Sequence, residues 1–371
     1  MATDKQHKNL NVPTLRFPEF TEEWRSVILR DCADFQKERI STELLNENTY
    51  ISTENILQNF AGVQSANSIP TNTNVIEYKE DDILLSNIRP YLKKVWYSDR
   101  SGGCSADVFV LRSNGCVPMF LYNVIASDKF INYVMSGTKG VKMPRGDRKH
   151  MEDFNLSIPT IVEQHKIAKF LNLLDKRIAT QKKVIEKLQS LIGGIYNRIF
   201  STIDNYCTLE QVCEIKKGQQ INGTELSDSG TYYVMNGGVE PSGYYTNFNT
   251  PEDTISISEG GNSCGYVQYN TSPFWSGGHC YTLLNTKVDQ HFLYHYLKAH
   301  EADIMKLRIG SGLPNIQKKD LAQFNVPSID LREQQHIAFA LNQISSKIAI
   351  ERALLSCYIE EKSYLLSVMF I

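Results

Sequence analysis

The sequence predicts an α+β protein made of two tandem α+β globules, each followed by a long helix, with the two helices pairing as an antiparallel coiled coil. The segment EQHKIAKFLNLLDKRI, which begins at Glu163, recurs as EQQHIAFALNQISSKI from Glu333, an offset of 170 residues. Each copy follows a short apolar run that ends in proline, at Pro159 and at Pro327. The expected segments are an N-terminal tail (1–18), a first globule (19–158), a first spacer helix (160–200), a second globule (205–327) and a second spacer helix (330–371).

The composition fits a cytoplasmic protein with ordinary cores and no membrane partner. The chain has 371 residues, of which 42% are hydrophobic, and no apolar run approaches the roughly 18 to 20 residues that span a bilayer. The eight cysteines form no C-x-x-C pair, so we expect reduced and mostly buried thiols. The net charge of -2 gives no global attraction to nucleic acid. A DNA-binding surface would therefore require local clusters of Lys and Arg.

The two globules share the same order of signals. Short alternating or β-branched runs are separated by glycine-rich turns, and the strand-like run 81–86 of the first globule corresponds to 252–258 of the second. Helical stretches are expected at 119–127 and 292–300. Each globule is therefore predicted to mix strands with a few short helices.

The two long helices are expected to form a coiled coil. Thr160 with Glu163 gives a capping box before the first helix, and apolar residues then follow at alternating steps of four and three. About 37 residues give a rod of roughly 55 Å, comparable to about 16 base pairs, and antiparallel pairing would place the globules at its opposite ends. The polar seam residues Gln181, Glu351 and Lys362 are either tolerated imperfections or a device that fixes the register. The predicted seam consists of Ile167, Leu171, Leu174, Ile178, Ile185 and Leu188 in the first helix and Ile337, Leu341, Ile344, Ile348 and Leu355 in the second.

Several of these features together resemble a known protein family. The opening P-x-L-R-F-P-x-F-x-x-x-W (13–24), the twin globules and a Pro-then-EQ-x-x-I-A helix after each one are similar to the specificity subunit of Type I restriction-modification enzymes. The resemblance covers nearly the whole chain from Pro13. It implies that each globule is a target-recognition domain for one half of a split, asymmetric site in double-stranded DNA. It also implies that the helices act as a ruler between the halves.

The same resemblance implies the partners. Two modification (methyltransferase) subunits would dock on the helices, and restriction (endonuclease and translocase) subunits would join through them. The chain itself would hold no cofactor, with S-adenosylmethionine, ATP and Mg²⁺ expected only in the partner subunits.

Two basic groups in the first globule are candidate DNA contacts. In the loop 137–150 the basic residues oppose only Asp147, and glycines at 137, 140 and 146 would let the backbone approach a duplex; the competing interpretation is a solvated charged loop. In SNIRPYLKK (86–94) an arginine could pair with guanine and an asparagine with adenine, or the segment is an ordinary strand-to-turn connection. The candidates are Lys139, Lys142, Arg145, Arg148 and Lys149 in the loop, and Asn87, Arg89, Lys93 and Lys94 after the strand.

The repeat places a second set in the other globule. The segment GSGLPN, which includes Ser311, corresponds to the first basic loop, and 258–262 corresponds to the strand end but carries no arginine. The two halves should therefore read different bases. Trp275 is expected in the core. The candidates are Asn315, Lys318 and Lys319 in the loop, Glu259 and Asn262 at the strand end, and Tyr244, Tyr245 and His279 among glycines.

No catalytic residue or metal site is predicted. The chain has no Pro-Pro for a methyltransferase tetrapeptide and no P-loop, and the E-x-K at Glu214 is not repeated in the first globule. His291 and His295 have helical spacing suited to a metal but lack the usual glutamate, so a helix surface is expected there. The alternative function is a non-catalytic coiled-coil scaffold or adaptor that does not read DNA. Steep salt dependence of DNA binding would distinguish the reader from the adaptor.

Overall fold

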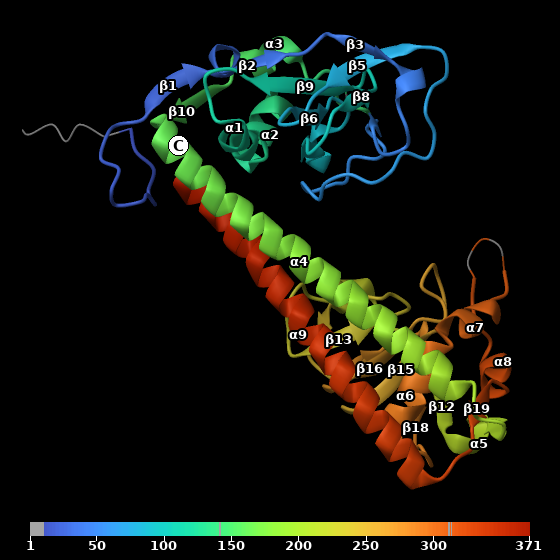
Figure 1. Ribbon diagram of the computed structural model, residues 1–371. Coiled ribbons are helices and arrows are strands. Elements are labelled where there is room, and N and C mark those ends of the chain that lie inside the picture. Colours follow the sequence, from blue (N-terminus) through green and yellow to red (C-terminus); the bar gives the residue numbers. More distant parts are fainter. Residues whose placement is uncertain (1–10, 141, 311, 313) are drawn as a thin grey trace, which may run out of the picture. The chain divides into compact units, whose positions relative to one another are not determined.

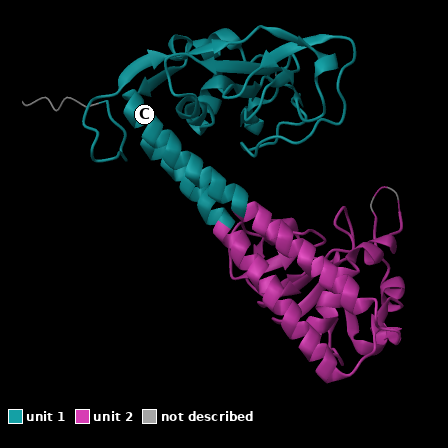
Figure 2. Cartoon of the chain, viewed as in Figure 1, with its two compact units in different colours: residues 1–180, 355–371 teal, residues 181–354 magenta. Residues whose placement is uncertain are grey.

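The computed structural model describes residues 11–140, 142–310, 312 and 314–371. The chain forms two compact units, of which the first comprises 1–180 with 355–371 and the second comprises 181–354 (Figure 2). Helices α4 (Ile161–Phe200) and α9 (Leu331–Met369) each contribute one part to either unit. Each unit therefore consists of one globule and a segment of both long helices (Figure 1).

The globule of the first unit contains three sheets. A two-stranded sheet has the order β1-β10, one four-stranded sheet has the order β2-β9-β6-β7, and the other has the order β3-β5-β8-β4. Its elements are β1 (Arg25–Ile28), η1 (Leu29–Asp31), β2 (Ala33–Phe35), β3 (Arg39–Ser41), η2 (Thr42–Leu44), β4 (Tyr50–Ile51), β5 (Asn74–Tyr78), β6 (Ile83–Ser86), η3 (Pro90–Leu92), β7 (Val95–Tyr97), β8 (Gly102–Cys104), β9 (Val108–Ser113), α1 (Pro118–Ile125), α2 (Asp128–Ser136), α3 (Arg148–Glu152) and β10 (Asn155–Ile158).

The globule of the second unit repeats this plan. Its sheets have the orders β11-β19, β12-β18-β15-β16 and β14-β13-β17. Its elements are β11 (Tyr206–Thr208), α5 (Leu209–Val212), β12 (Glu214–Lys217), η4 (Gly223–Glu225), β13 (Tyr232–Met235), β14 (Tyr244–Tyr245), β15 (Thr254–Ser258), β16 (Val267–Asn270), β17 (Trp275–Ser276), β18 (Cys280–Leu284), α6 (Gln290–Ala299), α7 (Glu301–Lys306), α8 (Lys318–Ala322) and β19 (Asn325–Pro327).

The central sheets of the two globules match strand for strand. Strand β6 pairs antiparallel with β9, with Ile83 opposite Leu111, and β15 pairs in the same way with β18, with Ile255 opposite Leu283. Strands β6 and β15 are buried on both faces. Strand β6 is accordingly an apolar run, whereas β15 alternates isoleucine with buried threonine and serine. The short terminal sheets β1-β10 and β11-β19 also correspond. The duplication seen in the sequence is therefore a duplication of structure.

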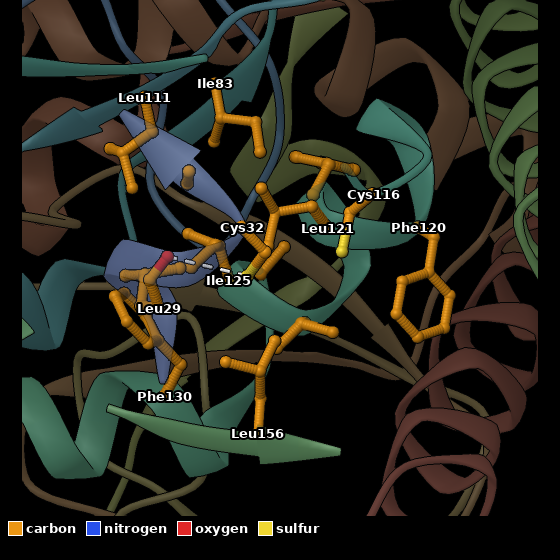
Figure 3. Close-up of a cluster of buried hydrophobic side chains, with 14 of the residues drawn as sticks. Leu29, Cys32, Ile83, Leu111, Cys116, Phe120, Leu121, Ile125, Phe130 and Leu156 are labelled. Carbon is orange, nitrogen blue, oxygen red and sulfur yellow. Dashed lines mark hydrogen bonds between the residues drawn. The ribbon is translucent and has the colours of Figure 1, made fainter. Parts of the chain in front are cut away.

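The first globule packs its central sheet against α1 and α2. Leu29, Ile83, Leu111 and Leu121 are completely buried in one cluster, which Figure 3 shows together with Phe120. The ring of Phe120 also lies 5.4 Å from that of Phe370, which follows α9. The globule core of the first unit therefore continues into its helix pair.

The long helices run antiparallel in each unit. In the first unit, Arg177 Nε donates to Tyr358 Oη at 2.7 Å, and Asp175, earlier in α4, pairs with Lys362, later in α9, at 2.5 Å. The predicted antiparallel coiled coil is confirmed. The seam residues Ile167, Leu171, Ile178, Ile185, Leu341 and Ile348 are buried, and Leu174, Leu188, Ile337, Ile344 and Leu355 are half-buried.

The polar seam residues meet polar partners. In the second unit, Gln181 Nε2 donates to the carbonyl of Glu351 at 3.0 Å and also to its carboxylate, and both side chains are buried. Lys347 Nζ lies 2.5 Å from Glu351, and this hydrogen bond lowers the pKa of the Glu351 carboxyl. The buried polar groups of Gln181 and Glu351 meet in only one alignment of the two helices. This supports the interpretation that the polar seam residues fix the register of the helix pair.

The glutamine of the EQ motif explains why the motif is repeated. Gln164 Oε1 accepts from Val117 N at 2.8 Å, and its Nε2 donates to the Pro159 carbonyl at 2.9 Å. Gln334 makes the same two bonds, to Asp289 N at 2.7 Å and to the Ile329 carbonyl at 2.9 Å. This side chain ties the start of the long helix to the N-cap residue of α1 in the first unit and to the N-cap residue of α6 in the second.

The cysteines and the helices add two further facts. All eight thiols are free, and those of Cys207 and Cys357 are the only ones that are not buried. None of the described helices is both long and apolar enough to cross a lipid bilayer.

Candidate nucleic-acid interface

In the first unit, three segments that are distant in sequence are joined by backbone hydrogen bonds. Asn87, directly after β6, donates its N–H to the carbonyl of Asp107, directly before β9, at 2.8 Å. Gly146 N donates to the Asn87 carbonyl at 2.9 Å, and Arg89 N donates to the Pro144 carbonyl at 2.8 Å. Lys139 and Arg145 exchange two backbone bonds of 3.0 Å and close a hairpin. We call this arrangement the strand-end frame.

The second unit builds the same frame with the same bonds. Glu259 N donates to the His279 carbonyl at 2.9 Å, Ile316 N to the Glu259 carbonyl at 2.8 Å, and Gly261 N to the Pro314 carbonyl at 3.0 Å. The hairpin is closed between Ile309 and Asn315. The frame therefore sets equivalent positions: Asn87 with Glu259, Arg89 with Gly261, Asp107 with His279, and Arg145 with Asn315.

The frame brings together the two basic groups that the sequence analysis treated separately. Residue 88 forms a β-bridge with Arg145, so the segment after β6 and the basic hairpin are neighbours. Arg89 has a φ of 51°, in the left-handed region, where its counterpart is Gly261 with a φ of 78°. A non-glycine residue held there is strained, and such strain is concentrated at functional sites. This favours Arg89 as a functional residue.

The basic hairpin is less positive than its sequence suggested. Arg145 Nη1 pairs with Asp107 at 2.6 Å, Arg148 Nε pairs with Glu152 at 2.7 Å, and Lys139 pairs with Asp147. The expectation that Asp147 alone opposes these residues is therefore wrong, because folding brings two more carboxylates to them. The bond from Lys139 lowers the pKa of Asp147.

Lys142 and Lys149 are the exposed cations of this loop that form no ion pair recorded among the described residues. They are exposed in the structure, and the ion pairs recorded among the described residues of the loop involve the other three basic side chains. Such ammonium groups suit phosphate oxygens, which they can reach without a fixed geometry.

The remaining candidates after β6 are held by their own globule. Lys93 pairs with Asp128 at 2.6 Å, and Lys94 Nζ donates to the Thr53 carbonyl at 2.5 Å. Burial lowers the pKa of Lys94. The Oδ1 atom of Asn87 is enclosed and has no partner among the described residues. Arg89 is thus the exposed side chain of this group of four.

Packing leaves no room for a side chain at Gly137, and a side chain at Gly146 would require the end of Met151 to move. A Cβ on Gly137 would lie 2.1 Å from His150 Cδ2, and a Cβ on Gly146 would lie 2.3 Å from Met151 Cε. Gly140 instead has a φ of +91°, which only glycine adopts easily. Close approach to a duplex is therefore not needed to explain these residues.

In the second unit the frame holds a compact charged group. The Glu259 side chain is almost enclosed, with Lys217 Nζ at 2.6 Å and His279 Nδ1 at 3.2 Å from its two oxygens. Because the carboxylate accepts, Nδ1 of His279 donates and Nε2 of the exposed ring is left for another partner. The carboxylate therefore orients the imidazole.

The other candidates of the second unit lie at the surface or on its small sheet. Asn262, Asn315, Lys318 and Lys319 are exposed, whereas Ser311 lies outside the described residues. Tyr244 and Tyr245 form β14 and are half-buried. The ring of Trp275 lies 5.1 Å from that of Tyr245, and its Nε1 donates to the Gln219 carbonyl at 2.9 Å. Trp275 is half-buried on this sheet instead of in the core, which corrects the expectation.

The sequence analysis did not identify Asp107, which belongs to the frame, or Lys217, which pairs with Glu259 of the frame. Asp107 and Lys217 approach it only through strand pairing, Asp107 before β9 and Lys217 at the end of β12. The sequence signal that could have identified Asp107 is an alignment of the repeats at the starts of β9 and β18, which makes Asp107 equivalent to His279.

His295 corrects a further expectation. Its side chain is completely buried, with Nδ1 2.9 Å from Tyr196 Oη and Nε2 2.8 Å from Asn342 Oδ1. It therefore links α6 to both long helices within the second unit and is not a helix-surface residue. Among the described residues, no group of three or more His, Cys, Asp or Glu side chains is placed to hold a metal ion.

Fold and frame together define a class of protein with two copies of one α+β module, each carrying a strand-end frame and joined to paired helices. Residues 21–190 and 205–356 match the family described as the Type I restriction modification DNA specificity domain. These matches cover more than half of the chain, and the chain belongs to this family.

Individual relatives agree with the family. A putative type I specificity subunit of Mycoplasma pneumoniae is 35% identical over 145 residues, which are 38% of this chain and 38% of that protein. The alignment thus spans little more than a third of that relative. The specificity subunit of the type I restriction enzyme MjaVIII of Methanocaldococcus jannaschii is 24% identical over 394 residues, covering 91% of this chain and 89% of that protein.

Solved structures share the fold. The crystal structure of the S subunit of a Type I restriction-modification system from M. genitalium has a TM-score of 0.72 to this chain at 19% identity, covering 97% of this chain and 99% of that one.

Proposed function

We propose that this chain is the DNA specificity subunit of a Type I restriction-modification complex and performs no chemistry itself. Residues 19–158 and 205–327 are its two target-recognition domains, and each reads one half of a bipartite, asymmetric site. The observation that carries the proposal is the strand-end frame, which is built twice with the same backbone bonds but with different side chains. Two dissimilar readers on one chain select an asymmetric site, whereas identical readers would select a palindrome.

The long helices supply the spacer in this proposal. Helix α4 has 40 residues, which at 1.5 Å per residue corresponds to about 60 Å. The hydrogen bond from Gln181 to Glu351 and the ion pair of Asp175 with Lys362 fix the register of the pair. A fixed register would give a fixed number of base pairs between the two half-sites.

The partners follow from the same assignment. Two modification subunits would bind the helices, restriction subunits would join through them, and S-adenosylmethionine, ATP and Mg²⁺ would be bound in those subunits. A solved structure with a TM-score of 0.53 to this chain is described as showing complex assembly and conformational transition of the type I restriction-modification system. We also propose a cytoplasmic location, because the DNA that such a complex would read lies there.

Mapping of methylated bases tests the function. The purified chain is combined with a modification subunit and S-adenosylmethionine, and random-sequence DNA is then sequenced for modified bases. The expected result is a two-part motif with a constant gap. Methylation without a motif, or a motif with only one part, would contradict the proposal.

A DNA-binding measurement alone distinguishes the proposed DNA reader from an adaptor protein. The complex should bind duplexes that contain the mapped motif, and its affinity should fall steeply as salt is added, because Lys and Arg contacts to phosphates release counterions. A protein that assembles with its partners but binds no DNA at low salt would be a scaffold and not a reader.

A further inference from the structure

We infer that Arg145, held by Asp107, selects a guanine in one half of the DNA site, and that Asn315, at the equivalent position of the second unit, selects an adenine in the other half. This inference rests on the proposed DNA-reading function. It goes further by assigning the base choice at one position to one residue in each unit, and by giving Asp107 a positioning role.

The backbone at residue 145 is fixed on both sides. It exchanges two hydrogen bonds of 3.0 Å with Lys139, and it forms a β-bridge with residue 88. The neighbouring residues Pro144 and Gly146 are bonded to Arg89 and Asn87 at 2.8 and 2.9 Å. A side chain that reads a base edge requires such a rigid base, because a misplacement of about 1 Å breaks a bidentate contact.

Asp107 orients the guanidinium and leaves one edge open. The recorded bond joins Nη1 of Arg145 to Oδ1 of Asp107 at 2.6 Å, and both side chains are partly exposed. Asp107 is itself fixed, because its carbonyl accepts the N–H of Asn87. Among the described residues no hydrogen bond of Nε or Nη2 is recorded, so the edge that they form is available, and its two parallel N–H donors match O6 and N7 of guanine in the major groove.

The second unit offers a different group at the same place. Asn315 is exposed, forms the same hairpin closure with Ile309 and forms a β-bridge with Gly260. A side-chain amide carries one acceptor and donors on adjacent atoms, which match N6 and N7 of adenine. The position of Asp107 is taken by His279, so the carboxylate that would orient an arginine is absent from this position of the second frame.

The other basic residues of the first hairpin are less suited to choosing bases. Lys149 is exposed, and the ammonium of Lys139 pairs with Asp147. An ammonium group is a compact point charge without a fork and fits phosphates of any sequence. Lys149 therefore provides a control in the same loop.

The experiment compares methylation motifs from complexes that contain the full-length chain. Arg145→Ala and Arg145→Lys should each relax one guanine position of one half-site, with a loss of discrimination on the order of tenfold to a hundredfold. Asn315→Ala should relax one adenine position of the other half-site only. Lys149→Ala should instead weaken methylation of all sequences alike and lower the salt slope of binding by about one.

The positioning role of Asp107 is tested by comparing single and double variants of Asp107 and Arg145. Asp107→Ala should relax the same guanine position as Arg145→Ala, and the double variant should be no more relaxed than Arg145→Ala alone. Asp107→Asn, which can still accept from Nη1, should recover part of the discrimination. A residue with a merely structural role would lower methylation without changing the preference at one position.

The outcomes separate this inference from the proposed function. If the wild-type complex gives a bipartite motif but Arg145→Ala and Arg145→Lys leave every position unchanged, the assignment of base choice is wrong and the function stands. Relaxation at both half-sites by a single variant would also overturn it. If the wild-type complex gives no bipartite motif, the proposed function itself fails.

Discussion

The EQ motif occurs in both units, but its glutamate has different surroundings in each. Gln164 and Gln334 are both buried and make matching pairs of bonds. Glu163 is completely buried, with both oxygens 2.7 Å from Arg16 and with Trp24 Nε1 at 3.3 Å, whereas Glu333 is exposed. The glutamine of the motif therefore has the same structural role in both units, whereas the glutamate has a structural role in the first unit alone.

The difference shows what duplication preserves. The glutamine satisfies backbone groups that every copy of the fold must satisfy, so both copies retain its bonds. The glutamate instead binds Arg16 and Trp24, which lie in the segment 11–24 at the start of the first unit. Hydrogen bonding to Glu163 raises the pKa of Arg16.

The largest contrast is expected for the two glutamates. Glu163→Ala should lower the free energy of unfolding of the first unit by about 3 kcal/mol, because it leaves the mostly buried guanidinium of Arg16 unpaired. Glu333→Ala should change the stability of the second unit by less than about 0.5 kcal/mol, since its side chain is exposed. Hydrogen exchange measured unit by unit provides the comparison. Equal losses in the two units would contradict the contrast.

The two glutamines should instead behave alike. Gln164→Ala leaves Val117 N and the Pro159 carbonyl without partners, and Gln334→Ala does the same to Asp289 N and the Ile329 carbonyl. Each change should lower the stability of its own unit by about 2 kcal/mol. The readout is the protection of backbone amides in α1 and in α6 under hydrogen exchange. A loss in one unit only would mean that the repeated bonds are not equivalent in energy.

One position of the frame has a left-handed backbone, and it is occupied by Arg89 in the first unit and by Gly261 in the second. Substitutions there should affect stability and DNA affinity differently. Gly261→Ala should destabilise the second unit by about 1 kcal/mol, because its φ is positive and a Cβ there meets no neighbour, so that only strain changes. Arg89→Gly removes that strain and should leave the stability of the first unit unchanged or slightly raised, while DNA affinity falls. Thermal unfolding and DNA titration of the same preparations test both statements. Lower stability of Arg89→Gly would show that Arg89 is there for packing.

The smallest effect concerns pH. Burial lowers the pKa of His295 and thereby keeps the ring neutral between Tyr196 and Asn342, with Asp289, His291 and Tyr294 also nearby. The unfolded chain binds a proton at His295 more readily than the folded one. The contribution is therefore complete above the unfolded pKa of about 6.5 and is lost as pH falls below it.

His295→Gln tests this contribution. Between pH 7.5 and 6 the wild-type second unit should lose at most about 0.8 kcal/mol more than the variant. Denaturant unfolding of both proteins at each pH gives the difference. The first unit has the non-titrating Asn123 at the equivalent place and should show no difference between the two proteins. Identical pH profiles of the second units would show that His295 is not kept neutral by burial.

The sequence alone determined the architecture because its signals are local and repeated. The recurrence of EQ-x-x-I-A after each proline established the duplication, and the four-three spacing from Ile167 to Leu188 established a paired helix. A side-chain period is set by backbone geometry within a few turns, so it can be identified without knowing the fold. Asn87 and Glu259 were matched in the same way, from the strands that precede them.

Only the tertiary structure decided which side chains meet. Arg16 lies 147 residues from Glu163, and Arg145 lies 38 residues from Asp107, so no local pattern could pair them. The burial of His295 was missed because it depends on α4 and α9 both packing against α6. Ion pairs and buried polar contacts form where segments distant in sequence pack together. The local spacing of residues does not predict which segments these are.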